Sequence, residues 1–327
     1  MKLLEFSRQF STEEDCERYL KEQREKHGMV CPKCGCKKMY WDKCHKRWVC
    51  SKCRKEVTLT SGTVMHGSNL PLLYWFTAIH LLTSTKKTFS ALEMQRQLGH
   101  KRYQPIWEMM HKLRDVMGRR DSEYKLTDII ELDEGYFSTD GTGSRDKDSN
   151  LKRGVGSQRK TKVLVMVESA ESDSPKKGQK SRKCGHIKMK VMKDLKSETF
   201  EKETGDCVDR EATVIMDGLH AHSGVEKTVA HSLKQVVPGK DAPKLLPWVH
   251  IAISNAKSLF ADMYHGVKDE FLQEYLNEFC YKFNRMFFGE RLFDRLILAS
   301  ISYRPEFEHR IYNHSDNRGK SYNFSGE

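Results

Sequence analysis

The stretch CPKCGCKKMYWDKCHKRWVCSKC, residues 31–53, contains two C-x2-C pairs that are separated by fifteen residues. This is the ligand spacing of a zinc ribbon, in which two short knuckles each direct two thiolates towards one tetrahedral Zn²⁺ ion. A module of this size is too small to fold on a core of its own, so metal binding has to supply its folding energy. We therefore predict a zinc ribbon over residues 28–60 with a structural Zn²⁺ ion, whose ligands are Cys31, Cys34, Cys50 and Cys53.

The alternative role for these cysteines is a pair of disulfides. Disulfides are typical of secreted proteins, and residues 1–10 are too short and too charged to resemble a secretory signal. Structural zinc is therefore favoured. Cys36, Cys44 and His45 lie between the two pairs and could replace a ligand, although their spacing fits a knuckle pair less well.

The charge of the chain indicates a polyanionic partner. The 327 residues include 57 Lys and Arg against 45 Asp and Glu, which gives a net charge of +12 and a pI near 9.1. The excess is concentrated in residues 31–55, 145–162 and 175–193. A run of charge is usually a solvated face, but three basic clusters in a zinc-containing protein favour double-stranded DNA. No apolar run is long enough to span a membrane, so we expect a cytoplasmic, nucleoid-associated protein.

Helical patterns flank the ribbon. A capping sequence that begins at Ser11 opens a predicted helix ending near Lys26, within the segment 1–27. Further helices are predicted over residues 72–82, 90–98 and 103–117, where apolar residues recur at helical spacing. A short helix, a glycine-containing turn and a longer helix are typical of a helix-turn-helix, although any small helical bundle shows the same pattern. Beside a basic zinc ribbon the pattern favours a DNA-binding domain over residues 61–120, with Trp75 and Trp107 in its core.

From about residue 121 the pattern changes to alternating strands and helices. Apolar runs and period-two alternation predict five strands, over residues 126–137, 161–168, 185–192, 212–216 and 232–237. Helices are predicted over residues 194–203, 251–263 and 268–286. This order of elements is that of a ribonuclease H-like domain. We therefore expect an α+β multidomain protein in which residues 121–300 form a ribonuclease H-like α/β catalytic domain with a mixed five-stranded sheet, followed by a polar tail over residues 301–327.

Two aspartates occupy the positions at which such a sheet brings carboxylates together. Asp133 lies on the first predicted strand and Asp217 ends the fourth. Phosphodiester chemistry with two Mg²⁺ ions needs hard oxygen ligands, and a buried aspartate is costly unless it is paired or metal-bound. Taken singly, Asp217 reads as a turn residue before Gly218, and Asp133 as a satisfied buried acid. Glu131 shares a strand face with Asp133 and could support a metal site, whereas Glu134 points to the other face.

Further motifs follow one another along the chain. They are Gly62-Thr-Val64, Glu131-Leu-Asp-Glu134, Gly185-His-Ile-Lys188, Met216-Asp-Gly218, Ser254-Asn-Ala-Lys257, Tyr264-His-Gly-Val267 and Glu278-Phe-Cys-Tyr-Lys-Phe-Asn-Arg285. Together with the ribbon cysteines and in this order, they resemble the DDE-type transposases of bacterial insertion sequences. The resemblance is to the ISXO-like group, which has an N-terminal zinc ribbon and a D-D-N-K or D-D-E-K signature, and it spans residues 12–298.

The resemblance implies roles for individual residues. Asp133 and Asp217 would be ligands of Mg²⁺ or Mn²⁺, Asn255 would stand at the third catalytic position as a further metal ligand, and Lys257 would contact DNA phosphate. The family implies binding to terminal inverted repeats, strand cleavage by activated water, and transfer of the freed 3′-hydroxyl into target DNA. A homodimer is expected on the DNA, because two ends must be processed together.

Asn255 departs from the acidic residue of the better-known triad. Its amide oxygen can bind Mg²⁺ but adds no negative charge, so the second ion should bind more weakly unless the scissile phosphate or Glu131 completes the site. Asp262, seven residues on and on the same helical face, is an alternative donor. His250 and His265 also match the family, and such residues are more often phosphate contacts or helix-end residues than metal ligands.

Two other classes of function are consistent with parts of the chain. A non-catalytic zinc-ribbon DNA-binding regulator would need only residues 1–120, and it leaves Asp133 and Asp217 without a role. A cellular ribonuclease H-like nuclease would share the metal site but would not need two N-terminal DNA-binding modules. The loop over residues 138–160, rich in Gly, Ser, Lys and Arg, is expected to be mobile in the free protein and ordered on DNA.

Overall fold

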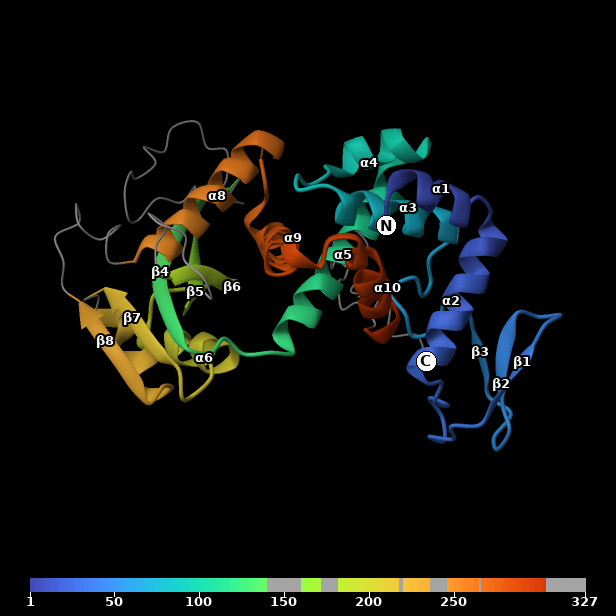
Figure 1. The fold of residues 1–327 in the computed structure, drawn as a ribbon, viewed down its shortest axis with the longest axis horizontal. Coiled ribbons are helices and arrows are strands. Elements are labelled where there is room, and N and C mark those ends of the chain that lie inside the picture. Colours follow the sequence, from blue (N-terminus) through green and yellow to red (C-terminus); the bar gives the residue numbers. More distant parts are fainter. Residues whose placement is uncertain (140–159, 172–181, 218–219, 236–245, 265, 304–327) are drawn as a thin grey trace, which may run out of the picture. The chain divides into compact units, whose positions relative to one another are not determined.

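A computed structural model describes residues 1–139, 160–171, 182–217, 220–235, 246–264 and 266–303. The chain forms two compact units, one made of Met1–Met117 together with the residues from Phe288 onwards, the other of Gly118–Phe287 (Figure 1). Most of the loop expected to be mobile, residues 140–159, lies outside the described residues. Within the described ranges, no helix is both long and apolar enough to cross a membrane.

The N-terminal unit combines helices with a small antiparallel sheet (Figure 1). The sheet has the strand order β1-β2-β3, with β1 over Met39–Asp42, β2 over Arg47–Cys50 and β3 over Glu56–Thr58. The helices are α1 (Leu3–Gln9), α2 (Glu13–His27), α3 (Leu72–Ser84), α4 (Ala91–Leu98), α5 (Tyr103–Ser122, which crosses the boundary between the units) and α10 (Leu292–Ser302). The predicted order of ribbon and helices is therefore confirmed, while α1 and α10 were not predicted.

The helix ends follow from local hydrogen bonding. Thr12 caps α2: its hydroxyl accepts the N–H of Asp15 at 3.2 Å, and the Asp15 carboxylate accepts the N–H of Thr12 at 3.1 Å. The capping box therefore begins one residue later than expected. Ser90 caps α4 in the same way, and Gly99 ends it in the left-handed conformation (φ 64°), which glycine adopts without steric cost.

The zinc-ribbon sheet packs on α2. Arg24 stacks 5.0 Å from the ring centre of Trp48, and its guanidinium donates hydrogen bonds to the carbonyls of Leu59 (2.6 Å) and Ser61 (2.9 Å). The indole N–H of Trp48 donates to Glu25 at 3.2 Å. Because Trp48 is almost fully buried, the ribbon and α2 share a core that the ribbon alone is too small to make.

The helix α10 belongs to the N-terminal unit. Its Phe293 lies in an aromatic cluster with Phe6, Phe10 and Phe76, at ring-centre distances of 5.6–6.2 Å. The backbone carbonyl of Ser300 in α10 accepts a hydrogen bond from the N–H of Val64 at 2.9 Å. The expected extent of the catalytic domain, residues 121–300, stays a prediction; contact clustering of the structure groups α10 with the first unit, where it packs on α3 and its Phe293 meets Phe6 of α1.

The second unit is built on a mixed five-stranded sheet, as predicted. The strands are β4 (Ile129–Ser138), β5 (Lys160–Glu171), β6 (Arg182–Met192), β7 (Thr213–Asp217) and β8 (His231–Gln235), in the spatial order β6-β5-β4-β7-β8. The β4–β5 and β5–β6 pairs are antiparallel, whereas β4–β7 and β7–β8 are parallel. The helical elements are α6 (Ser197–Cys207), η1 (His220–Lys227), α8 (Pro247–Met263), η2 (Asp269–Phe271), α9 (Leu272–Asn284) and η3 (Met286–Arg291), which reaches into the first unit.

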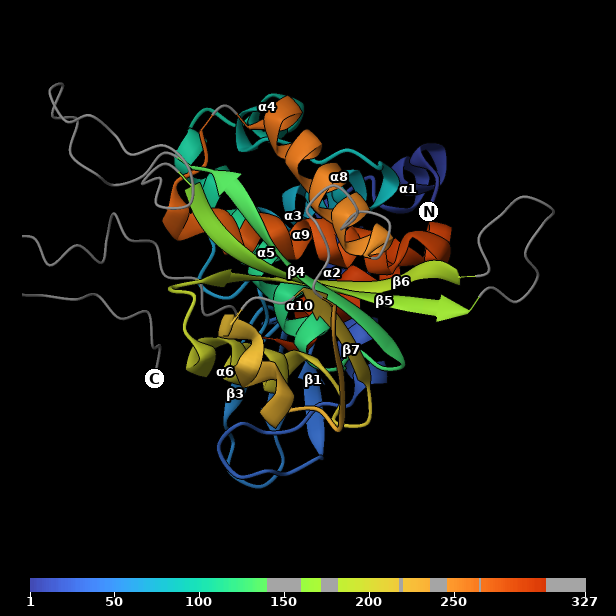
Figure 2. The same ribbon diagram turned by 90° about the vertical axis from the view of Figure 1, so that its left-hand side faces the viewer.

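Each face of this sheet is covered by its own layer (Figure 2). One face packs on α8 and α9 through a cluster that includes Val163, Val165 and Val167 of β5. The other packs on α6 and η1 through a cluster that includes Ile130 and Leu132 of β4. Since side chains alternate along a strand, Glu131 and Asp133 point to the α8 side and Glu134 to the η1 side.

The outer edge of β6 is occupied by side chains of α9. The amide group of Asn284 accepts the N–H of Ile187 at 2.7 Å and donates to its carbonyl at 2.9 Å. Gln273 likewise accepts the N–H of Val191 at 2.8 Å and donates to the carbonyl of Met189 at 3.0 Å. Two side-chain amides therefore take the place of a further strand, which protects an edge that would otherwise be open to pairing with another chain.

We predict that His186→Gln destabilises the second unit in a pH-dependent manner. The hydrogen bond from His186 to Glu168, 2.8 Å long, raises the pKa of His186 above 6.5. The contribution of this pair is therefore complete below the unfolded pKa and is lost as the pH rises through the folded value. Urea unfolding should show a loss of about 0.5–1 kcal/mol near pH 6 that shrinks above pH 8. His231→Gln, on an exposed position of β8, is the control, and an equal loss at both pH values for His186→Gln would contradict the prediction.

Candidate functional site

The two knuckles of the ribbon have the same backbone geometry. The N–H of Gly35 donates to the carbonyl of Cys31 at 2.9 Å, and the N–H of Arg54 donates to the carbonyl of Cys50 at 3.1 Å. Gly35 and Arg54 both have positive φ values, 69° and 58°. This conformation is easy for glycine but costs about 1 kcal/mol for other residues, so the second knuckle holds Arg54 in a turn that the four-cysteine arrangement requires.

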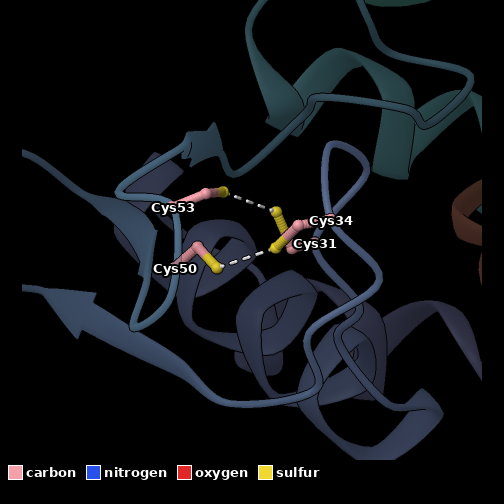
Figure 3. A group of neighbouring side chains, drawn as sticks. All are labelled: Cys31, Cys34, Cys50 and Cys53. Carbon is pink, nitrogen blue, oxygen red and sulfur yellow. Dashed lines mark hydrogen bonds between the residues drawn. The ribbon is translucent and has the colours of Figure 1, made fainter.

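The four sulfur atoms face one another in a single cluster (Figure 3). All four lie within 4.8 Å of one another, with Sγ–Sγ distances of 3.5 Å for Cys31 and Cys53 and 3.6 Å for Cys34 and Cys50. A tetrahedral zinc ion with Zn–S bonds of about 2.3 Å needs sulfurs about 3.8 Å apart, so the cluster has the size of a zinc site. Among the described residues it is the one group of three or more His, Cys, Asp or Glu side chains that meets this criterion for a metal ion.

The thiols of the cluster differ in their pKa values. Although burial acts against it, the N–H groups of Lys33 and Cys34 lower the pKa of Cys31 to about 7. The N–H of Cys36 acts to lower the pKa of Cys34, but burial and the other sulfurs raise it to about 12. A divalent cation removes this conflict, because it favours the thiolate form of every ligand.

Cys36, Cys44 and His45 are not part of the cluster. The Cys36 sulfur lies 3.6 Å from the Ser51 hydroxyl. His45 pairs with Asp42 at 2.7 Å near the tip of the β1–β2 hairpin, where Cys44 is exposed. The alternative ligands are therefore set aside, and Cys31, Cys34, Cys50 and Cys53 are confirmed as the cluster.

The second candidate site lies where β4 and β7 run side by side. These strands are parallel, with Leu132 opposite Met216, so the next residues, Asp133 and Asp217, are neighbours on adjacent strands. Neighbouring strands are about 4.8 Å apart. Ile215 packs on the α8 side of the sheet, and alternation would direct Asp217 to the same side as Asp133. Asp217 is however the last residue of β7, and at this strand end its carboxylate also lies within 3.0 Å of His222 in η1. The two predicted carboxylates are brought together at the end of the parallel pair.

The helix α8 runs along β4 on this side of the sheet. Its first turn is fixed by Glu131, whose carboxylate accepts the N–H groups of Trp248 at 2.7 Å and Val249 at 3.0 Å. In the same turn, the Nδ1 atom of the next residue, His250, lies 3.5 Å from the Asp133 carboxylate. Glu131 was expected to support the metal site; in the structure its carboxylate satisfies the free N–H groups at the start of α8, and it acts on the site by fixing the helix.

On the opposite side of the sheet, a buried histidine connects the two strands. The Nε2 atom of His222 in η1 lies 2.5 Å from the Glu134 carboxylate, and its Nδ1 atom lies 3.0 Å from the Asp217 carboxylate. The His222 side chain is fully buried. Neither His222 nor Glu134 was predicted as a functional residue. The only available sequence signal was their closeness in the chain to the two aspartates, five residues from Asp217 and one from Asp133.

The site contains charges that burial disfavours. Burial, together with the charges of Glu134 and Asp217, raises the pKa of Asp133. Burial alone would lower the pKa of His222, but the carboxylates of Glu134 and Asp217 raise it above its usual value. The two carboxylates therefore favour the charged imidazole, the form in which both ring nitrogens can donate hydrogen bonds.

The third and fourth predicted residues lie on α8. Lys257 follows His250 by seven residues, or two turns, and lies on the same stripe of the helix; its amine is 5.9 Å from the ring centre of Phe137 on β4. Burial and the charge of Lys160 lower the pKa of Lys257, against the effect of Asp133. Asn255 is exposed and lies about 140° around the helix from His250.

The structure therefore associates Lys257 with the aspartates but places Asn255 on another flank of α8. Asp262, the alternative donor, is exposed and lies two turns beyond Asn255 on that same flank. His265 lies outside the described residues.

The four-cysteine sheet and the mixed five-stranded sheet each lie within a segment that matches a known domain family. The ISXO2-like transposase domain family matches residues 125–284, and the transposase zinc-ribbon domain family matches residues 11–56. Residues 125–284 are therefore an ISXO2-like transposase domain, and residues 11–56 are a transposase zinc-ribbon domain. These two parts of the chain carry the large sheet and the four-cysteine cluster.

Matches to individual proteins are more distant. A solved structure described as a pre-cleavage Mos1 transpososome matches 71% of this chain and 80% of that chain, at 11% identity and a TM-score of 0.28. Another, a Mos1 transposase paired-end complex with the left transposon end, matches 70% and 79%, at 12% identity and a TM-score of 0.27. TM-scores this low do not establish a common fold. No curated protein matches the chain significantly.

We predict that Cys53→Ser removes zinc from the ribbon, because a hydroxyl in place of a thiolate leaves only three soft ligands. The metal content of the purified protein should fall from about one zinc ion per chain towards zero, and a Co²⁺-substituted sample should lose its tetrahedral thiolate absorption. Cys36→Ser is the matched control, since Cys36 lies beside the cluster without belonging to it. Equal zinc loss in both variants would contradict the assignment.

Proposed function

We propose that this protein is the transposase of an insertion sequence. In this proposal it binds the terminal inverted repeats of the element as a homodimer, cleaves a DNA strand at each end, and transfers the freed 3′-hydroxyl into target DNA. The observation that carries the proposal is the placement of Asp133 beside Asp217 on the parallel strands β4 and β7, in a chain of the DDE transposase class.

The chemistry of the two aspartates fits a divalent cation. Carboxylate oxygens are the ligands that Mg²⁺ and Mn²⁺ prefer, and burial together with the charges of Glu134 and Asp217 raises the pKa of Asp133. A bound cation would favour the charged carboxylate. When bound at such a site, the metal supplies an activated water and stabilises the leaving oxygen. Asp133 and Asp217 would hold the cation from two adjacent strands, so the separation of these ligands would be set by the sheet.

Lys257 is proposed to bind the DNA backbone next to the aspartates. Its amine lies on the stripe of α8 that faces β4, two turns from His250. A lysine at this position places a positive charge where the phosphate adjoining the cleaved bond would lie, and it offsets the repulsion between that phosphate and the carboxylates.

The N-terminal unit is proposed to recognise the ends of the element. The ribbon offers basic side chains, and the turn between α4 and α5 exposes Lys101 and Arg102 directly before α5. A short helix, a turn at Gly99 and a longer helix are the parts of a helix-turn-helix. Contacts of lysine and arginine with phosphates make the affinity depend steeply on salt, which distinguishes this mode of binding from an apolar interface.

We predict that Asp133→Asn and Asp217→Asn each abolish Mg²⁺-dependent cleavage of DNA that carries the element ends, with a loss of at least about a thousand-fold. Binding of the same DNA, measured by fluorescence anisotropy in the absence of Mg²⁺, should stay within about two-fold. Glu171→Gln, an exposed carboxylate at the end of β5, is the control. Full cleavage by either aspartate variant would remove the assignment, and a preference of the native protein for RNA–DNA hybrids would indicate a cellular nuclease instead.

Asn255 is proposed as the third metal ligand on the basis of its position in the family signature. We predict that Asn255→Ala lowers cleavage by about ten- to a hundred-fold, because a metal ligand is lost, whereas Asn255→Asp retains activity because a carboxylate supplies the same oxygen with an added charge. The concentration of Mg²⁺ that gives half-maximal rate should be lower for Asn255→Asp. Native activity in Asn255→Ala would place this residue outside the site, and the same measurements on Asp262→Asn would then test the alternative donor.

A further inference from the structure

The buried imidazole of His222 makes contact with acids from two different strands. Its Nε2 atom lies 2.5 Å from Glu134 on β4, and its Nδ1 atom lies 3.0 Å from Asp217 at the end of β7. The side chain of Glu134 is 7% exposed, whereas that of Asp217 is 48% exposed. One carboxylate is therefore buried with the ring, and the other extends from it towards solvent.

The segment that carries His222 is held in place by close packing. In η1, the Ser223 hydroxyl lies 3.0 Å from the Ser197 hydroxyl at the start of α6. A Cβ atom on Gly224 would lie only 1.9 Å from the Ser197 carbonyl oxygen, so η1 approaches α6 at a distance that only glycine permits. The ring of Phe200 meets the imidazole edge-on at a ring-centre distance of 5.0 Å. The imidazole consequently has a fixed position relative to the sheet.

The side chain of Asp217 is half-exposed at the end of its strand. Asp217 is the last residue of β7, one residue beyond the last pair with β4. A half-exposed aspartate at a strand end keeps its rotamer freedom unless a hydrogen bond fixes it. The Nδ1 atom of His222 also lies 3.4 Å from the Asp217 backbone carbonyl, so the ring is directed at both acceptor groups of this residue.

We propose that His222, anchored by Glu134, is a positioning residue that holds the Asp217 carboxylate in the orientation needed to bind the catalytic cation. The proposal rests on the function proposed above for Asp217. Glu134 directly follows Asp133 in β4, so one imidazole connects the two strands that carry the metal-binding aspartates. Groups that hydrogen-bond to metal ligands in this way typically change metal affinity by ten- to a hundred-fold when they are removed.

The two ring nitrogens can be tested separately. Asparagine places an amide near the position of Nδ1, and glutamine places one near that of Nε2, and each amide donates hydrogen bonds. His222→Asn should therefore keep the contact with Asp217 and lose the one with Glu134, whereas His222→Gln should do the reverse. Glu134→Gln leaves the imidazole in place with an uncharged acceptor.

The measurement is Mn²⁺ binding to the zinc-loaded full-length protein, followed by the electron paramagnetic resonance signal of free Mn²⁺ in the absence of DNA. We expect His222→Gln to weaken Mn²⁺ binding by about ten- to a hundred-fold, and His222→Asn and Glu134→Gln to weaken it by less than about five-fold. Thermal unfolding of the zinc-loaded variants without added Mn²⁺ checks the fold, and His186→Gln, another histidine paired with a carboxylate on the same sheet, should bind Mn²⁺ normally.

The result that would overturn the inference is native Mn²⁺ affinity in a folded His222→Gln variant, or an equal loss in His222→Asn and His222→Gln. Asp217→Asn distinguishes this failure from failure of the proposed function. If Asp217→Asn loses Mn²⁺ binding while His222→Gln retains it, Asp217 is a ligand and His222 does not position it. If Asp217→Asn binds Mn²⁺ normally, the assignment of Asp217 as a ligand is itself wrong.

Discussion

The parallel pairing of β4 with β7 is the constraint on which the rest of the second unit depends. Its register sets Leu132 against Met216 and thereby places Asp133 beside Asp217. A shift by one residue would direct one of the carboxylates to the opposite side of the sheet, because side chains alternate along a strand. The four residue pairs between β4 and β7 set this register through backbone hydrogen bonds, and the antiparallel β4–β5 ladder holds the other side of β4 over ten residue pairs.

Several acids lie in the middle of the sheet, where burial disfavours their charged forms, and neighbouring elements supply partners for three of them. Glu131 satisfies the free N–H groups at the start of α8, Glu134 pairs with His222, and Asp133 has His250 at 3.5 Å. Breaking a buried pair of charges is costly because the remaining charge loses its partner. The helices that cover the two faces are therefore positioned by the same acids that surround the candidate metal site, which links the stability of the unit to the geometry of its chemistry.

The sheet of the N-terminal unit is too small to have a core of its own. Four sulfur atoms within 4.8 Å of one another provide the metal-binding end of the ribbon, and α2 provides an apolar and cationic surface for Trp48. Zinc and α2 thus act at different parts of the same module. The aromatic cluster around Phe293 then joins α1, α3 and α10, although α10 lies almost 300 residues from the start of the chain.

The sequence by itself determined the zinc cluster, because four cysteines at that spacing satisfy one ion whatever surrounds them. It also indicated the order of the strands and of most helices, and the two aspartates as candidates, since strand periodicity and the cost of a buried acid are local properties. Only the tertiary structure decided which acids have which partner: Glu131 on the first turn of α8, Glu134 on His222, and α10 in the N-terminal unit. The pairing of Glu134 with His222 joins residues 88 positions apart, and that of Glu131 with Trp248 joins residues 117 positions apart. They depend on how two layers pack against one sheet, and no local pattern of residues contains that information.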